Sequence, residues 1–176
     1  MKGVRLPDGF RLERLGREHH RRGFDCGESA VNAWLTTKAL QHQAKHLSAT
    51  KVLLDGADAI AGYYTLATGQ VDFNDLPVEA VKHLPRRVLP VATLAWLGVA
   101  KQRQGQGLGR TLLAQALRDC WEAGNTFPFF AVILDCLNDA SKKFYRQWDF
   151  AELPGHPFRL YLSAKLLDAM MRDEIK

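Results

Sequence analysis

The stretch QRQGQGLGRT, which begins at Gln102, combines residue types that can bind a phosphate group. It lies between an apolar run, LPVATLAWLGVA, and a segment with the apolar spacing of a helix, LLAQALRDCW. The first amides of a helix lack intrahelical partners and point along the positive end of its dipole, and glycines let an anion approach them. The turn therefore predicts a phosphate or pyrophosphate site, the alternative being a mobile turn whose glycines only permit a tight bend. The residues concerned are Gly105, Gly107, Gly109, Arg103 and Arg110.

The same turn does not match the common nucleotide motifs. It fails the dinucleotide pattern G-x-G-x-x-G, and it lacks the Gly-Lys-Ser/Thr ending of the P-loop. A different anion-bearing cofactor is indicated.

The elements that must position this turn alternate between strand and helix patterns. A β-rich first half precedes a βαβα order, which predicts an α/β (α+β) fold with a central mixed sheet flanked by helices. We expect Ser29 to cap the first helix, and the strand before the turn to be buried on both faces. Trp34 and Leu35, and the FPFF cluster that starts at Phe127, are interpreted as packing residues. Strands are predicted at 10–15, 50–71 (a hairpin), 91–100, 127–137 and 158–164, and helices from 29, around 77–84, and at 107–124, 139–148 and 165–176.

Length and composition favour one globular domain, residues 1–176, with 47% hydrophobic and 24% charged residues. The N-terminal segment lacks the apolar middle of a secretion signal and no stretch is long enough to span a membrane, so we expect a cytoplasmic protein without membrane contact. Cys26, Cys120 and Cys136 predict reduced, mostly buried thiols. The formal charge of +5 indicates either a polyanionic partner or a basic surface without one.

Residues 102–107, QRQGQG, match the Q/R-x-x-G-x-G/A signature of the GNAT N-acetyltransferases, and their place between a strand and a helix is the place that family uses. The chain thus resembles a GNAT fold. The resemblance implies acetyl-coenzyme A as cofactor, with its pyrophosphate on the loop amides and its pantetheine arm along the preceding strand. In the segment NDASKKFYRQWDF it also implies a site for Asn138 near the pantetheine and for Tyr145 near the thioester sulfur. The residues assigned to the cofactor are Leu97, Gly98, Val99, Gln102, Arg103, Gln104, Gly105, Gln106, Gly107, Leu108, Gly109, Arg110 and Asn138.

A narrower resemblance, carried by FDCGESAVNAWL, SATKVLL, GYYTLATGQV and LPRRVLPVATLAWLGVA, is to the GNAT toxins of bacterial toxin–antitoxin modules. It implies acetylation of aminoacyl-tRNA, inhibition of translation, a homodimer, and a ribbon-helix-helix antitoxin through which DNA is bound only indirectly. Two departures stand out. Trp96 and Ala100 occupy positions where Arg and Asp are usual, which bears on specificity and activity, and WDF replaces the common x-G-F.

The implied reaction is direct attack of an amine on the acetyl thioester. Backbone N–H groups around Leu97 to Val99 would bind the developing oxyanion, at about 3 kcal/mol per donor, and Tyr145 would act as general acid. The strand VATLAWLGVA contains no Asp or Glu to serve as base. An α-amino group, with a pKa of ~8, needs a base less than a lysine amine at ~10.4, although a water chain or a distant carboxylate could also serve. Candidate contacts to RNA phosphates are Arg86, Arg87, Lys142, Lys143 and Arg146.

Two other functions remain open from the sequence. One is an ordinary acetyltransferase of protein N-termini, polyamines or other small amines, whose expression without a partner should be harmless. The other is a weakly active GNAT fold that binds RNA or an antitoxin–DNA complex. The histidines show no metal-binding pattern: His42 and His46 are four apart but lack a third ligand, so we predict no metal.

Overall fold

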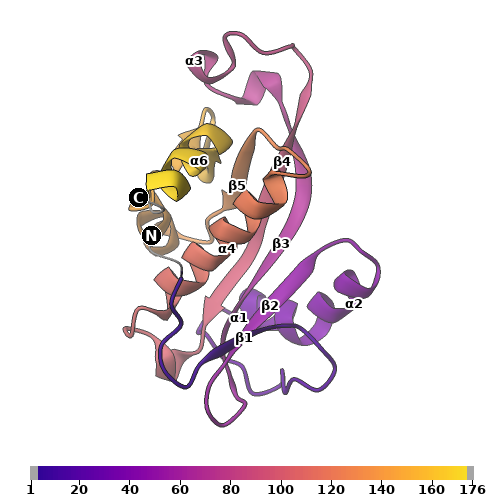
Figure 1. The fold of residues 1–176 in the computed structure, drawn as a ribbon, viewed down its shortest axis with the longest axis vertical. Helices are drawn as coiled ribbons and strands as arrows, with labels where there is room; N and C mark the ends of the chain where they lie inside the picture. The colour runs from indigo at the N-terminus through magenta and orange to yellow at the C-terminus, as the bar shows by residue number, and fades with distance from the viewer. Residues whose placement is uncertain (1–3, 174–176) are drawn as a thin grey trace. The chain divides into compact units, whose positions relative to one another are not determined.

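The computed structural model of the chain describes residues 4–173, and its elements alternate as the sequence predicts (Figure 1). Within these residues seven strands form one mixed sheet in the order β1-β2-β3-β4-β5-β7-β6, in which β4 and β5 are parallel. The mixed sheet flanked by helices is therefore confirmed. The strands are β1 (Arg11–Arg14), β2 (Ala49–Leu54), β3 (Ile60–Asp72), β4 (Val88–Val99), β5 (Ala131–Asp135), β6 (Ala151–Leu153) and β7 (His156–Ser163). The helical elements are α1 (Ser29–Ala33), η1 (Trp34–Lys38), α2 (Ala39–Ala44), η2 (Phe73–Asp75), α3 (Val78–Val81), η3 (Lys101–Arg103), α4 (Leu108–Gly124), α5 (Asp139–Arg146) and α6 (Ala164–Asp173).

The described residues divide into two compact units. The first unit comprises 4–67 and 94–119, and the second comprises 68–93 and 120–173. Strands β3 and β4 and helix α4 contribute residues to both.

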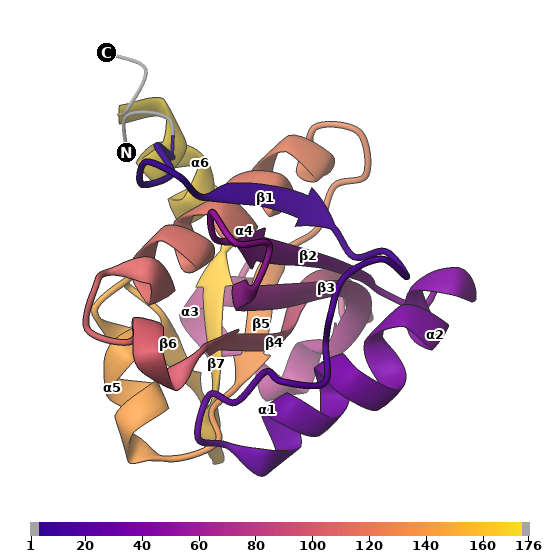
Figure 2. The same cartoon turned by 90° about the horizontal axis from the view of Figure 1, so that it is seen from below.

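In the first unit, α1, η1 and α2 cover β2 and β3 (Figure 2). Val31, Leu35 and Ala39 are buried against strand residues such as Val52 and Tyr63. The middle of this helical segment is a π-helix, in which the Ala39 amide donates to the carbonyl of Trp34, five residues earlier. Because a π turn holds more than four residues, a spacing of four keeps the three apolar side chains on one face.

The predicted cap of the first helix is wrong by one residue. Ser29 is the first helical residue, and Glu28 occupies the N-cap position without a side-chain capping bond. The segment 25–28 is fixed instead by Asn32, whose side chain accepts from the Cys26 amide at 2.9 Å and donates to Asp25 at 2.9 Å.

In the second unit, β5 lies between β4 and β7, and its residues Ala131 and Ile133 belong to a core cluster with Val71, Val91 and Leu153. The interpretation of the FPFF cluster as strand packing holds only in part. Phe130 packs against this core, but β5 begins only at Ala131 and Phe127 is 79% exposed. The short strand β6, which pairs with β7, was not predicted, since three residues are too few to show a period.

The strand before the turn is also more exposed than its sequence predicts. Val88, Pro90 and Ala95 of β4 are exposed, and Trp96, Leu97 and Val99 are half-buried. An apolar run does not by itself distinguish a strand covered on both faces from one that is covered on a single face for much of its length.

The expectation for the cysteines is met. Cys26, Cys120 and Cys136 are free thiols, of which the last two are buried. No helix within residues 4–173 is both long enough and apolar enough to cross a membrane.

Candidate functional site

The turn between β4 and α4 has the open geometry expected of an anion site. Gly105 and Gly107 adopt φ values of 78° and 81°, which L-residues rarely adopt. A Cβ built on either glycine meets no atom within 4 Å, so the chain conformation and not crowding requires glycine here. The turn thus presents bare backbone on an open face.

The amides that follow form the start of a 17-residue helix. The Thr111 amide donates to the Gly107 carbonyl at 3.2 Å, so the amides of Leu108, Gly109 and Arg110 precede the first bond of the helical ladder. These amides lie at the positive end of the α4 dipole, where they can donate to an anion. Arg110 is exposed beside them, whereas the Leu108 side chain is buried in the core.

Gln104 holds the turn in place through hydrogen bonds of its side chain. Its amide nitrogen donates to the carbonyls of Cys26 at 2.8 Å and of Val99 at 2.9 Å, which joins the turn to the end of β4. The side chains of Gln102, Gln104 and Gln106 are all exposed, but only that of Gln104 makes these two bonds, so it is a positioning group.

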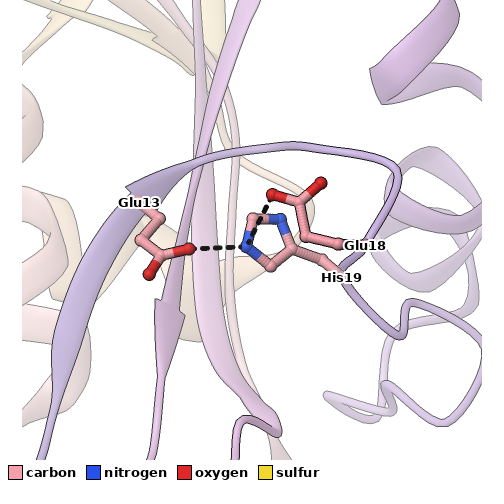
Figure 3. Close-up of side chains that lie close together, drawn as sticks. All are labelled: Glu13, Glu18 and His19. Atoms are coloured by element: carbon pink, nitrogen blue, oxygen red, sulfur yellow. Dashed lines mark hydrogen bonds and ion pairs between the residues drawn. The ribbon is translucent and has the colours of Figure 1, made fainter.

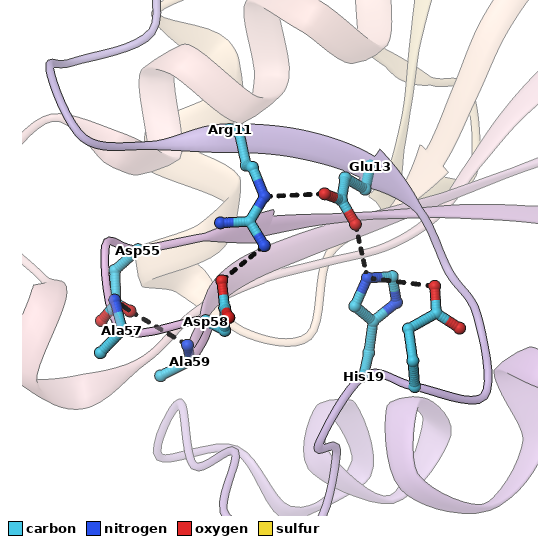
Figure 4. Close-up of polar contacts among 8 residues, drawn as sticks. Arg11, Glu13, His19, Asp55, Ala57, Asp58 and Ala59 are labelled. Atoms are coloured by element: carbon cyan, nitrogen blue, oxygen red, sulfur yellow. Dashed lines mark hydrogen bonds and ion pairs between the residues drawn. The ribbon is translucent and has the colours of Figure 1, made fainter.

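Arg103 is paired with a carboxylate that the sequence did not reveal. Its Nη2 donates to Asp55 Oδ2 at 2.8 Å, and its guanidinium lies 5.4 Å from the ring centroid of Phe10. Asp55 also accepts from the amides of Ala57 and Ala59 in the β2–β3 turn (Figure 4). The only sequence signal at Asp55 was its Asp-Gly turn, which indicated a hairpin and not a partner for the loop.

The hydrogen bonds to ionised Asp55 fix the turn, and they depend on pH. The Arg103 guanidinium and the turn amides hold the pKa of Asp55 below its ordinary value. Ionised Asp55 therefore stabilises the fold above pH ~4, and that contribution is lost as the pH falls through the lowered pKa of the folded state. We expect Asp55→Asn to lower the free energy of unfolding at pH 7 and to flatten its decrease between pH 5 and 2. Urea titrations across this range test it, and an unchanged acid slope would contradict it.

The end of β4 is closely packed on one side. A Cβ on Gly98 would lie 2.7 Å from Cγ1 of Val31, so glycine allows α1 to approach the strand. Leu97 and Val99 flank it and are half-buried. Ala100, where the resemblance leads one to expect a carboxylate, is buried and contributes to the apolar core of the first unit.

Asn138 is the N-cap of α5 and Tyr145 lies within that helix, in the second unit. The Asn138 side chain accepts from the Ser141 amide at 2.9 Å, and Ser141 Oγ accepts from the Asn138 amide, which makes a capping box. Asn138 therefore has a structural task as the helix cap. Tyr145 is only 8% exposed, packs between the rings of Phe144 and Phe150, and has a pKa raised by burial. Its phenol is protonated at neutral pH and can donate.

The predicted RNA-contact residues of the second unit differ in whether they form ion pairs with carboxylates. Lys142 and Arg146 both approach Glu152, at 2.7 and 3.3 Å, and Lys142 also lies over the ring of Phe158. Lys143 is exposed, and with Lys142 and Arg146 it lines an open hollow on α5. Arg86 and Arg87 are exposed in the segment before β4, with Arg86 over the ring of Phe73.

Glu13, Glu18 and His19 form a cluster whose ligand atoms lie within 4.8 Å of one another (Figure 3). His19 Nδ1 accepts from the Gly16 amide at 2.9 Å, so in the neutral ring Nε2 carries the proton and donates to Glu13 at 2.8 Å. A metal ion would need the lone pair at Nε2, which this arrangement does not supply. The cluster is better explained as a structural network, extended by Arg11 to Asp58 (Figure 4).

Loss of this network should destabilise the protein. His19→Ala removes a buried side chain and leaves the half-buried Gly16 amide and a Glu13 oxygen without their partner, and we expect the free energy of unfolding to fall by about 1–3 kcal/mol. Urea titration measures it, with His20→Ala, at an exposed position, as the control. Equal effects of the two variants, or stabilisation of the wild-type chain by Zn²⁺, would contradict this interpretation.

Comparison with known proteins places the chain in a class. The family model described as Acetyltransferase (GNAT) family matches residues 17–150, and the chain belongs to this family of acetyl-coenzyme A-dependent acetyltransferases. The resemblance and the fold expected from the sequence are thereby confirmed.

More particularly, the chain is similar to GNAT toxins. It is 32% identical over 151 residues to the tRNA-acetylating toxin of Mycobacterium tuberculosis, with 85% of this chain and 89% of the relative covered. The solved structure of AtaT complexed with acetyl-methionyl-tRNAfMet has a TM-score of 0.85 and 27% identity, and covers 92% of this chain and 99% of that chain. A tyrosine-to-phenylalanine mutant of the AtaT toxin, bound to the C-terminus of the antitoxin AtaR and to acetyl-CoA, has a TM-score of 0.78 and 25% identity, with 93% and 99% covered.

Proposed function

We propose that this chain transfers the acetyl group of acetyl-coenzyme A to the free α-amino group of aminoacyl-tRNA, and so acts as the toxin of a toxin–antitoxin module. The observation that carries this proposal is the open turn of Gly105 and Gly107, followed by the unpaired amides at the start of α4, in a chain similar to a tRNA-acetylating toxin over most of its length.

The described residues fit the cofactor. The amides at 105–110 would bind its pyrophosphate, with Arg110 as the nearby charge, because Arg103 is already paired with Asp55. The backbone of Leu97 to Val99 would lie along the pantetheine arm. Acetyl-coenzyme A supplies an acetyl thioester whose carbonyl carbon is open to attack by an amine.

Backbone amides of β4 and the phenol of Tyr145 would stabilise charge and transfer protons during the reaction. As the C–N bond forms and the C–S bond breaks, N–H groups of the β4 segment would stabilise the carbonyl oxygen. Tyr145, kept protonated by burial, would donate its proton toward the leaving sulfur. The amine loses one proton to solvent water, and Tyr145 regains its proton from solvent after the thiol has left. Since β4 contains no Asp or Glu, an α-amino group, substantially neutral at pH 7–8, suits this site better than a lysine amine.

The basic residues of the second unit would contact the tRNA backbone. Glu152 offsets part of the charge of Lys142 and Arg146, so Lys143 is the least compensated member of the α5 group. Arg86 and Arg87 would add contacts from another segment. Such contacts raise affinity without reading sequence.

We expect Lys143→Ala to weaken tRNA binding for all tRNAs alike and to reduce the slope of log K against log salt by about 1. Filter binding at several salt concentrations measures both. The control is Lys165→Ala, at another exposed lysine. An unchanged slope for Lys143→Ala, or the same change for both variants, would exclude the assigned contact.

The proposal extends to partners. We propose one catalytic domain, since β3, β4 and α4 run through both units, acting in the cytoplasm as a homodimer. A ribbon-helix-helix antitoxin would neutralise it, and DNA would be bound only through that antitoxin.

The function is tested with labelled acetyl-coenzyme A and purified protein, offered charged tRNA, uncharged tRNA, spermidine and a peptide with a free N-terminus. We expect label on charged tRNA only, and growth arrest when the chain is expressed alone. Label on the peptide or the polyamine, with harmless expression, would instead support a general amine acetyltransferase.

A further inference from the structure

Two half-buried indoles of the first unit are stacked on each other. Trp34 begins the π-helix η1, and Trp96 lies on β4. Their ring centroids are 5.4 Å apart and their planes differ by 15°. Both indoles pack against the apolar core of this unit, and each remains partly accessible to solvent.

The position of Trp34 is fixed by polar bonds beneath it. Its Nε1 donates to Thr65 Oγ1 at 3.0 Å, and that hydroxyl is 2.7 Å from Thr50 Oγ1. Both threonines are fully buried, and the ring of His42 meets Trp34 edge-on at 4.7 Å. A π turn, an element often found at functional sites, sets the start of this arrangement. Trp34 is thus a rigid support for Trp96.

Trp96 also occupies a particular place on β4. It precedes Gly98 by two residues, so both lie on the same face of the strand, about 7 Å apart along it. The segment Leu97–Val99 is the one to which the proposed function assigns the thioester. A group attached next to the attacking amine is therefore within reach of the Trp96 ring.

The surroundings of the pair favour an apolar group. Side chains gathered with the indoles in this cluster include Cys26, Leu40 and Ile60. A surface of this kind gains from covering methyl, methylene or aromatic groups, and gains nothing from covering a carboxylate.

We propose that Trp96, supported by Trp34, selects the aminoacyl group of the substrate by packing against its side chain. Large apolar residues are preferred over glycine and over acidic residues. This inference rests on the proposed function and names the substrate class within it. Trp96 is a specificity determinant, and Trp34 is a positioning residue that acts through it.

The test compares kcat/KM of the wild-type chain and its variants for methionyl-, isoleucyl-, phenylalanyl-, glycyl- and aspartyl-tRNA. For Trp96→Ala, we expect the preference for the three apolar substrates over glycyl-tRNA to fall about 10- to 100-fold, the range that a few methylene contacts supply. Trp96→Phe should keep most of the preference because it retains a ring. Trp34→Phe, which loses the bond to Thr65, should show a smaller fall. Trp121→Ala, at a half-buried tryptophan of the second unit, is the truncation control and should leave the ratio unchanged.

The outcomes separate the two proposals. If the wild-type chain acetylates no aminoacyl-tRNA, the proposed function fails and this inference fails with it. If the wild-type chain is active but Trp96→Ala slows all five substrates equally, the selectivity is overturned while the function stands. Such a uniform loss is the result expected if the ring stacked on the terminal base that every tRNA shares.

Discussion

Replacing Tyr145 by phenylalanine is expected to lower kcat for aminoacyl-tRNA acetylation by about 10²- to 10⁴-fold, the usual contribution of a positioned general acid. The substitution removes one hydroxyl and keeps the ring that packs with Phe144 and Phe150. Its effect should therefore fall on the chemical step, while the dissociation constant of acetyl-coenzyme A stays within about twofold and the melting temperature changes little. Single-turnover kinetics with saturating tRNA, together with calorimetric titration of the cofactor, measure these quantities.

The matched control is Tyr161→Phe, which removes a hydroxyl from another tyrosine of the second unit, on β7. It should retain near wild-type activity. Full activity in Tyr145→Phe would remove Tyr145 from the mechanism and leave the leaving thiolate to be protonated by solvent.

Gly107→Ala is expected to weaken acetyl-coenzyme A binding about 10- to 100-fold. The new methyl group would stand on the open face of the turn and prevent one close contact between a backbone amide and the pyrophosphate, and a hydrogen bond to a charged group contributes about 1.5–3 kcal/mol. The left-handed backbone at this position adds a stability loss of about 1–3 kcal/mol. Titration calorimetry and thermal unfolding separate the two effects.

Gly155→Ala supplies the control for strain, because Gly155 has a φ of 77° and open space around its Cβ position, in the turn between β6 and β7. The control should lose comparable stability and keep its affinity for the cofactor. Equal affinities in both variants would mean that the turn does not hold the pyrophosphate.

The fold was largely predictable because its longer elements follow simple periods. The hairpin, the strand before the turn, and helices α4 and α5 all show apolar spacing and turn residues that identify them locally. The π-helix at Trp34 was not predictable, since its extra residue preserves a spacing of four that also fits an ordinary helix. Strand β6 is too short to carry a pattern.

The candidate site was predictable where backbone conformation defines it and less so where side chains meet across the chain. Positive φ angles at Gly105 and Gly107 follow from glycine itself. The bonds of Gln104 to Cys26 and of Arg103 to Asp55, and the stacking of Trp96 on Trp34, join residues 48 to 78 positions apart, and no local pattern indicates them. For Asn138, residue type and position at the start of a helix indicate a helix cap more directly than they indicate a contact with the cofactor.

The central claim is that the acetyl group reaches the α-amino group of the amino acid carried by tRNA. The most direct measurement is mass spectrometry of the aminoacyl-adenosine released by nuclease from tRNA treated with acetyl-coenzyme A and the wild-type chain. We predict a mass increase of one acetyl group located on the amino acid nitrogen, absent when the tRNA is uncharged. An acetyl group found on a nucleobase or a ribose, or an unmodified aminoacyl-adenosine while the chain binds and turns over the cofactor, would contradict the account.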